Sequence, residues 1–219
     1  SDSPVQTELA DLDGDGKLDI VCTTYGNAVA VLRNNSTLGV ISTASFEPPV
    51  YYYIDAAFGM ELNAGLAIGD IDNDGKLDIV SVRGGMVSVL RNLSSPGCIS
   101  ATSFASKVDF LAGTNPSDVV LFDVDGDGKL DVATTNYDSN SISVLRNTST
   151  RGIINAQSLS TAVDFAVNLS PNVLEVGDLD GDGKLDLICS NFNAHSISIL
   201  ENTSTIGIID VSSFSSAMD

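Results

Sequence analysis

The sequence predicts an all-β fold, a β-propeller of four-stranded antiparallel blades with four blades in this chain. Three observations predict it. One acidic nine-residue segment recurs four times, and its copies begin 53 to 59 residues apart, at Asp11, Asp70, Asp123 and Asp178. The segments beside each copy are short, apolar and β-branched, with no helical period. A solenoid is the competing architecture, but its repeats are usually shorter, at about 20–45 residues.

The four strands of a repeat follow in a fixed order around the acidic segment. The first strand leads into it and follows a residue seven places before the first aspartate: Pro4, Asn63, Pro116 or Pro171. The second strand comes directly after the acidic segment, and the third alternates, as in Ser-Ile-Ser-Val-Leu-Arg-Asn from Ser141. A fourth, more polar strand is expected at the exposed edge. These edge segments run over Phe46 to Ile54, Phe104 to Phe110, Leu159 to Phe165 and from Phe214 onward.

The chain is long enough for a substantial core, with 219 residues of which 43% are hydrophobic. We expect a single β-propeller domain or propeller segment, residues 1–219, with repeats at about 1–57, 58–112, 113–167 and 168–219. Two interpretations stay open: the four blades close a ring of their own, or they belong to a larger propeller.

The acidic segments have aspartate at positions 1, 3, 5 and 9, glycine at position 6 and lysine at position 7. No hydrophobic core needs four aspartates within nine residues, and without a cation they would repel one another. The candidate metal-binding residues are Asp11, Asp13, Asp15, Lys17 and Asp19 in the first copy, Asp70, Asp72, Asp74, Lys76 and Asp78 in the second, Asp123, Asp125, Asp127, Lys129 and Asp131 in the third, and Asp178, Asp180, Asp182, Lys184 and Asp186 in the fourth.

The donor types favour calcium. Calcium takes about 6–8 oxygen ligands at about 2.3–2.6 Å, whereas softer metals prefer His or Cys, which these loops lack. Glycine at position 6 permits the left-handed backbone that wraps an ion, and Asn73 at position 4 tolerates the same conformation. The lysine at position 7 is expected to donate only its backbone carbonyl, which leaves its ammonium group free to point into solvent. The sequence therefore predicts four Ca²⁺ per chain.

Two other interpretations of the loops are weaker. An EF-hand needs a glutamate at position 12 and flanking helices, but position 12 is Cys22, Ser81, Thr134 or Cys189. A solvated acidic turn is possible for one Asp-Gly segment, but four copies at matched positions argue against it.

The motif Asp-Leu-Asp-Gly-Asp-Gly-Lys-Leu-Asp, followed by an apolar strand and Ser-Ile-Ser-Val-Leu-Arg-Asn, resembles the FG-GAP/VCBS-type repeats of bacterial surface proteins. Those repeats are related to the calcium-binding blades of integrin α-subunit propellers. The resemblance covers essentially the whole chain. It implies a β-propeller with calcium in the loop between the first two strands of a blade, usually with seven blades, in a secreted, extracellular or bacterial cell-surface protein that acts in cell adhesion.

The charge of the chain excludes some partner classes. The formal net charge is −19, and four bound Ca²⁺ would bring it to −11, which argues against nucleic acid or an anionic membrane as partner. No stretch approaches the roughly 18 apolar residues of a membrane helix, so direct membrane insertion is not expected. No signal peptide is visible, and an export signal is expected to have been removed or to lie outside this sequence.

The cysteines and the N-x-S/T sequons have structural interpretations. Cys22, Cys98 and Cys189 are interpreted as small core residues rather than as disulfide or reactive cysteines. Four sequons, those at Asn34, Asn92, Asn147 and Asn202, share one place after the third strand, which indicates a structural turn rather than glycosylation. The remaining sequons begin at Asn35 and Asn168.

Catalysis is not expected, because His195 is the lone histidine and no nucleophile elbow or phosphate loop occurs. We expect a calcium-stabilised module that recognises a protein or glycan ligand; the alternative is a structural spacer in a long surface protein. The stretch from Glu47 to Asn63 is longer than its counterparts and carries Tyr51, Tyr52 and Tyr53. Tyr52 matches Phe110 and Phe165 at a core position, which leaves Tyr51 and Tyr53 on the opposite face. Self-association that completes a propeller is compatible with these repeats.

Overall fold

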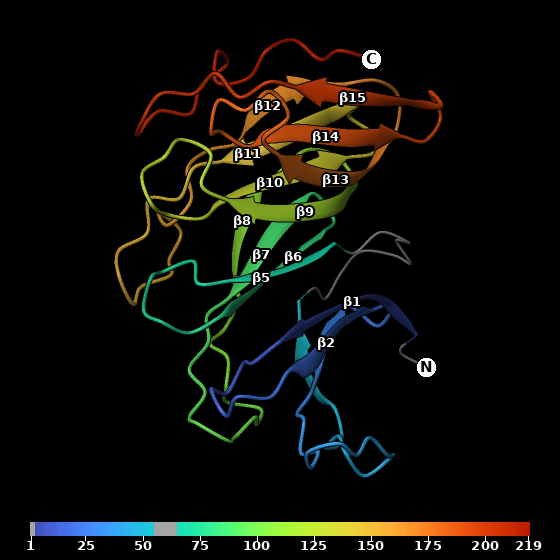
Figure 1. Cartoon of the computed structure of the whole chain (residues 1–219), viewed down its shortest axis with the longest axis vertical. Helices are drawn as coiled ribbons and strands as arrows, with labels where there is room; N and C mark the ends of the chain where they lie inside the picture. The colour runs from blue at the N-terminus through green and yellow to red at the C-terminus, as the bar shows by residue number, and fades with distance from the viewer. Residues whose placement is uncertain (1–2, 55–64) are drawn as a thin grey trace.

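The structure is a computed structural model that describes residues 3–54 and 65–219. The described residues form fifteen β-strands and no helix, which confirms the all-β prediction (Figure 1). Accordingly, the described part of the chain holds no helix that is long and apolar enough to cross a membrane.

Each repeat forms one antiparallel sheet, or blade, whose strands pair in chain order. Blade 1 contains β1 (Pro4–Ala10), β2 (Asp19–Thr24), β3 (Ala28–Leu32) and β4 (Val50–Tyr53). Blade 2 contains β5 (Leu66–Gly69), β6 (Asp78–Arg83), β7 (Met86–Leu90) and β8 (Val108–Leu111). Blade 3 contains β9 (Pro116–Phe122), β10 (Asp131–Asn136), β11 (Ser141–Leu145) and β12 (Val163–Ala166). Blade 4 contains β13 (Pro171–Gly177), β14 (Asp186–Asn191) and β15 (Ser196–Leu200).

The edge strands are shorter than the sequence predicts. The beginning of each predicted edge segment pairs with its blade only through a single bridge. In blade 2, for example, Phe104 pairs with Asn92. In blade 4 the edge is reduced to one bridge between Ile199 and Met218, and this sheet has three strands. The edge strands that do form have one buried residue each, as in β8, where only Phe110 is buried.

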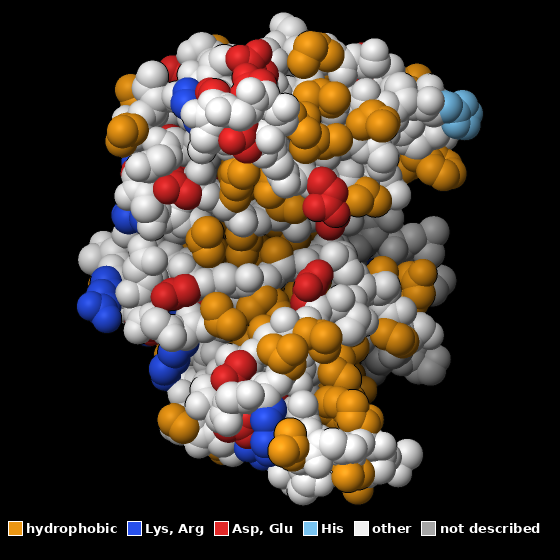
Figure 2. Space-filling model, viewed as in Figure 1, with side chains coloured by type: hydrophobic (Ala, Val, Ile, Leu, Met, Phe, Trp, Pro, Cys, Tyr) orange, Lys and Arg blue, Asp and Glu red, His pale blue; other side chains and the backbone are white. Residues whose placement is uncertain are grey.

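The first strands of consecutive blades are neighbours. Strand β1 contacts β5, β5 contacts β9, and β9 contacts β13, so the four inner strands lie side by side (Figure 1). In the view of Figure 2, which matches that of Figure 1, hydrophobic side chains lie along the middle of the molecule, with acidic side chains among them. Strands β1, β9 and β13 begin at the predicted prolines, whereas Asn63 and the first repeat boundary lie outside the described residues.

The hydrophobic core is divided among the spaces between neighbouring blades. One cluster joins blades 1 and 2, with Leu12, Val29 and Tyr52 from the first and Ile79 and Ile99 from the second. A second cluster joins blades 2 and 3, and a third joins blades 3 and 4. Each blade is therefore stabilised mainly by its neighbours, because a four-stranded sheet cannot bury both of its faces alone.

A polar contact repeats at each of these three interfaces. The turn after the third strand of one blade inserts an asparagine and a serine against the acidic loop of the preceding blade. In blade 2, Asn92 donates to the carbonyls of Leu12 and Leu77 at 2.8 Å each, and Ser94 donates to Leu12 as well. Asn147 and Asn202 make the same pair of bonds in blades 3 and 4.

These bonds confirm that the repeated sequons are structural turns. Asn92, Asn147 and Asn202 are 0–1% exposed, and each side-chain amide nitrogen already donates two hydrogen bonds. An attached sugar would need this nitrogen to be accessible, so these positions are closed to glycosylation in the folded chain.

The prediction for the cysteines is wrong at one position. Cys189 is buried and Cys22 is half-buried, but Cys98 is exposed, and none forms a disulfide. Cys98 ends a tight turn that bridges to Ser95 on the outside of blade 2. Its counterparts Val40 and Ile153 are also about half exposed, and the turns of Cys98 and Ile153 contact the preceding blade through the amides of Gly97 and Gly152.

The asparagine contact gives a test of the fold. We expect Asn92→Ala to lower the free energy of unfolding by about 2–3 kcal/mol, because the carbonyl of Leu77 loses its side-chain donor and the carbonyl of Leu12 keeps only that of Ser94. Asn34 is the matched control: among the described residues its side chain donates only to Leu18 of its own blade, so Asn34→Ala is expected to cost about 1 kcal/mol or less. Urea denaturation of dilute protein measures both, and equal losses would contradict the inter-blade role.

Candidate functional site

The four acidic loops lie between the first and second strands of their blades, as the sequence predicts. Their tight curvature depends on left-handed residues: Gly16 has φ of 85°, and the counterparts at position 6 have φ between 87° and 97°. Asn73 replaces glycine at position 4 with φ of 53°, a value that asparagine tolerates better than other side chains do. The predicted backbone of the loops is confirmed.

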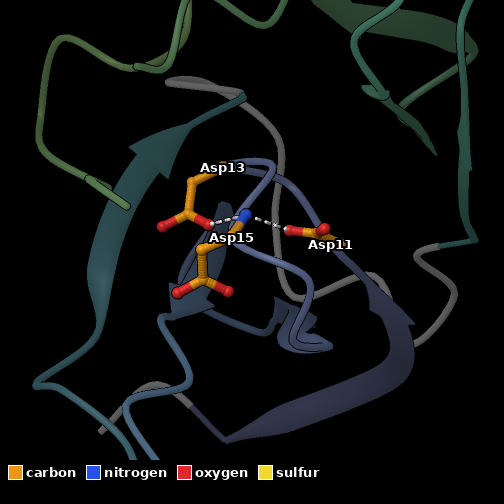
Figure 3. A group of neighbouring side chains, drawn as sticks. All are labelled: Asp11, Asp13 and Asp15. Atoms are coloured by element: carbon orange, nitrogen blue, oxygen red, sulfur yellow. Dashed lines mark hydrogen bonds between the residues drawn. The ribbon is translucent and has the colours of Figure 1, made fainter. Parts of the chain in front are cut away.

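The aspartates at positions 1, 3 and 5 are drawn together by backbone amides of their own loop. In blade 1 the amide of Asp15 donates to Asp11 at 3.1 Å and to Asp13 at 3.2 Å, so the two carboxylates flank this nitrogen (Figure 3). The amides of Gly16 and Lys17 donate to Asp11 and Asp15. Blades 2 and 3 repeat these bonds.

The aspartate at position 9 closes the loop. In blade 2, Asp78 accepts the amide of Ile71 at 3.0 Å with one oxygen and the amide of Asn92 at 2.8 Å with the other. Asp78 and its counterparts Asp19, Asp131 and Asp186 are 0–3% exposed. This residue therefore ties the loop to the turn after the third strand of the same blade.

The structure brings three carboxylates of each loop within 4.8 Å of one another. The groups are Asp11, Asp13 and Asp15; Asp70, Asp72 and Asp78; Asp123, Asp125 and Asp127; and Asp178, Asp180 and Asp186. The fourth aspartate of each loop, Asp19, Asp74, Asp131 or Asp182, lies outside its group. The contribution of the carbonyls of Lys17, Lys76, Lys129 and Lys184 stays a prediction.

Burial makes the charged form of the position-9 carboxylates costly. The pKa of Asp78 is raised to about 7, mainly by loss of solvent and also by the charges of Asp72 and Asp74, while two backbone amides act to lower it. The pKa of Asp131 is raised to about 7 by the same burial, and the pKa of Asp19 is raised as well. A positive charge in the loop would stabilise these carboxylates in their ionised form.

Arginines that sequence reasoning missed partly supply such a charge. Arg33, directly after β3, donates through Nε to Asp13 at 2.5 Å and through a terminal nitrogen to Asp15 at 2.7 Å. Arg91 and Arg146 make the same two bonds in blades 2 and 3. The signal was present in the sequence, because an arginine recurs at this place in three of the four repeats.

The fourth loop differs from the other three. Glu201 stands where the other blades have arginine, and no guanidinium contacts Asp180 or Asp182 within the described part of the chain. Asp178, Asp180 and Asp182 are exposed, whereas Asp13, Asp72 and Asp125 are buried. The turn of the following blade covers each of the first three loops, and no turn among the described residues covers the fourth.

The expectation that the lysine ammonium groups point into solvent is wrong for three of the four. Lys76, Lys129 and Lys184 donate through Nζ to the carbonyls of Ser94, Ser149 and Ser204 at 2.7–2.9 Å. These carbonyls belong to the asparagine-serine turns, which curl beside the loop of their own blade. Lys17 is the exception, and its Nζ lies 4.0 Å from Asp15.

The donor set fits a hard divalent cation. Every side chain in the four groups offers carboxylate oxygens, and each oxygen that accepts one N–H retains a further lone pair. The arginines take one oxygen, Oδ2, of positions 3 and 5 and leave Oδ1 to backbone amides. The loops can therefore hold a metal without losing the arginine contact.

Comparison with known proteins identifies the repeat. The sequence profile of the FG-GAP-like repeat matches three overlapping segments, residues 11–81, 70–134 and 123–189, each of which begins at an acidic loop. No curated protein matches the chain significantly.

Solved structures share the fold. One is a lectin of Agrocybe aegerita whose title describes specific recognition of non-reducing terminal N-acetylglucosamine; it is 20% identical, with a TM-score of 0.55, and the match covers 99% of this chain and 52% of the other. Another is BBS1N in complex with ARL6DN, which is 10% identical, with a TM-score of 0.58 and coverage of 95% and 57%. The chain thus spans about half the length of these structures, and at this identity the likeness shows the fold alone.

The arginine contact gives a second test. In EDTA we expect Arg91→Met to lower the free energy of unfolding by about 2 kcal/mol, because Asp72 is fully buried and loses its guanidinium partner while the apolar stem is retained. The control is Arg151→Met at an exposed position, where we expect a change within about 0.5 kcal/mol. Chemical denaturation measures both, and a loss of the same size for Arg151 would contradict the assigned role.

Proposed function

Because this chain belongs to the FG-GAP-like repeat family, we propose that it is a calcium-binding β-propeller module of an extracellular or cell-surface protein that acts in adhesion or ligand recognition. The calcium is structural. Its role is to neutralise the acidic loops and to hold the blades together, and the ligand, a protein or a glycan, binds elsewhere on the module.

The observation that carries this proposal is the convergence of three carboxylates within 4.8 Å in all four loops. At that separation like charges repel strongly unless a cation or a proton lies among them. Three arginines offset part of the charge, but the loops hold 16 of the 29 acidic residues of the chain. Calcium suits loops that are made of oxygen donors and that leave room for water.

The chain itself would hold each ion through the aspartates at positions 1, 3, 5 and 9 and the lysine carbonyl at position 7. The bound ion supplies two positive charges, which stabilise the ionised form of carboxylates such as Asp78. The amides of the loop orient these carboxylates in advance, so little reorganisation is needed when the metal binds.

The stabilisation by calcium supports an extracellular location. A ligand that binds only the folded state stabilises it by RT ln(1 + [Ca²⁺]/Kd), which for a Kd of ~10 µM and extracellular calcium near ~1 mM is about 2.7 kcal/mol per site. Four independent sites would contribute on the order of 10 kcal/mol, comparable to the whole stability of a domain. At cytosolic calcium near ~0.1 µM such sites would stay largely empty.

Binding rather than catalysis is the proposed activity. The carboxylates of the loops are engaged with backbone amides and arginines, which leaves them poorly suited to proton transfer. The alternative function is a purely structural spacer in a long surface protein, and the edge of blade 1 favours recognition over that alternative.

The edge strand of blade 1 carries exposed tyrosines, and one of them takes the place of an aspartate that pairs with a serine in blade 2. Ser88 faces and bonds Asp109 in blade 2, but at the matching place Ala30 faces Tyr51 in blade 1. Tyr51 is 40% exposed and Tyr53 is 72% exposed. Tyr52 is buried, as its match to Phe110 predicts, and its ring packs edge-on against Phe104. Exposed tyrosines are frequent anchors for protein and glycan ligands.

The first test of this function concerns the metal. We expect isothermal titration to find four Ca²⁺ per chain with preference over Mg²⁺, and the melting temperature to be much higher in millimolar CaCl₂ than in EDTA. Asp70→Ala, which removes one of the three converging carboxylates of blade 2, should reduce the stoichiometry to three, whereas Asp138→Ala, at an exposed aspartate of a turn in blade 3, should leave it at four. No calcium uptake, or the same melting temperature in both buffers, would overturn the proposal.

The second test separates recognition from a spacer role. The calcium-loaded chain is applied to an array of glycans and matrix proteins, and we expect Tyr53→Ala to weaken the strongest interaction by about tenfold or more. Leu111 is the matched control, because it occupies the same place on β8 and is 71% exposed. If no array member binds, or if Leu111→Ala weakens binding equally, the spacer function is the better one.

A further inference from the structure

The two end blades expose opposite halves of the interface that the inner blades form with one another. On blade 4, Leu179 is 56% exposed, whereas its counterparts in the first three loops, Leu12, Ile71 and Val124, are 0–2% exposed. On the same face Ile197 is 58% exposed, and its counterparts Val29, Val87 and Ile142 are fully buried. This face, which we call the tail face, also includes Met218, which is 57% exposed.

Blade 1 exposes the complementary half. Leu9 and Leu18 are 59% and 55% exposed, but their counterparts in blade 2, Ile68 and Leu77, pack against the core between blades 1 and 2. Ile41 is 83% exposed, and its counterpart Ile99 is 8% exposed. We call the surface of Leu9, Leu18 and Ile41 the head face.

The polar groups of the two faces also match. In blade 2, Asn92 and Ser94 donate to the carbonyl of Leu12, and the amide of Gly97 donates to the carbonyl of Asp13. The head face has Asn34, Ser36 and Gly39 at these three places, and among the described residues none of them donates to another blade. The tail face has the acceptors, the carbonyls of Leu179 and Asp180, and no described residue donates to either of them.

The tail face differs in charge from the corresponding faces of blades 1 to 3, and this difference suits the head face. In the inner interfaces the guanidinium of one blade lies against the turn of the next. A terminal nitrogen of Arg33, for example, lies 3.6 Å from the point that a Cβ atom would occupy if Gly97 had a side chain. Blade 4 has Glu201 instead of this arginine. The matching turn of the head face, residues 36–41, lines a hollow of about 540 Å³ together with Lys17, whose ammonium group lacks the serine carbonyl bond of the other lysines.

We propose that the tail face binds the head face of a second copy of this chain, so that the interface between neighbouring blades continues from one molecule to the next. In this contact Asn34 and Ser36 of one copy donate to Leu179 of the other, Leu9, Leu18 and Ile41 pack against Leu179 and Ile197, and Lys17 lies near Glu201. The two faces lie at opposite ends of the long axis of the molecule, so they do not meet within one chain (Figure 1).

The proposed contact is heterologous, which determines the assemblies that it can form. It joins two different surfaces, so each bound copy still offers one free head face and one free tail face. Such heterologous contacts produce closed rings if the rotation per copy closes, and open chains if it does not. Association is therefore expected to depend on protein concentration and on both faces at once.

Sedimentation velocity of the 219-residue chain tests the proposal, from about 1 µM to about 300 µM in about 0.15 M salt with millimolar calcium, where repulsion between acidic copies is screened. We expect the average mass to rise from the 22.8 kDa of one chain to twice that value and beyond. Leu9→Glu on the head face and Ile197→Glu on the tail face should each keep the chain monomeric. Leu111→Glu, the same kind of change at an exposed leucine of blade 2, should associate as the parent does.

Mixing the two monomeric variants distinguishes this arrangement from other modes of association. Leu9→Glu retains an intact tail face and Ile197→Glu an intact head face, so a mixture should form a one-to-one dimer and nothing larger. Thermal melts establish that each variant is folded, which is expected because the substituted side chains are exposed. A parent chain that stays monomeric throughout, variants that associate alone, or a mixture that stays monomeric would overturn the proposal.

Discussion

The structure depends on the contact between the acidic loop of one blade and the asparagine-serine turn of the next. The loop offers a buried carbonyl, and the turn offers the amide and hydroxyl that satisfy it, as Asn92 and Ser94 do for Leu12. The same loop is closed by Asp19, which accepts the amide of Leu12. Loop conformation and blade packing are therefore coupled, because a loop that opened would leave buried polar groups of two blades without partners.

Electrostatics is the second constraint on the loops. Four aspartates within nine residues are unfavourable in a folded chain, and the three covered loops each have an arginine that bonds positions 3 and 5. The uncovered fourth loop lacks the arginine and is solvated instead. Burial by a neighbouring blade and pairing with arginine thus occur together, which is expected because a buried carboxylate needs a partner and an exposed one does not.

The division of the core among interfaces leaves one face of blade 1 and one face of blade 4 exposed in the described part of the chain. Blades 2 and 3 bury residues on both of their faces, whereas blade 1 exposes Leu9 and Ile41 on one face and blade 4 exposes Ile197. Repeat architectures need capping of such ends or further contacts that cover them. The acidic loops and the end faces are therefore two aspects of one repeated interface.

The sequence by itself determined the local features: the four loops, the left-handed Gly16 and Asn73, the strand that begins at Pro116, and the buried Tyr52. Each of these follows from residue types within a few positions of one another. The tertiary structure decided the arginine pairs, the bonds of Lys76 and its counterparts, and the exposure of Cys98. Asn92 and Leu12 are 80 residues apart and meet only when two blades pack, and no local periodicity encodes which side chain a neighbouring blade covers.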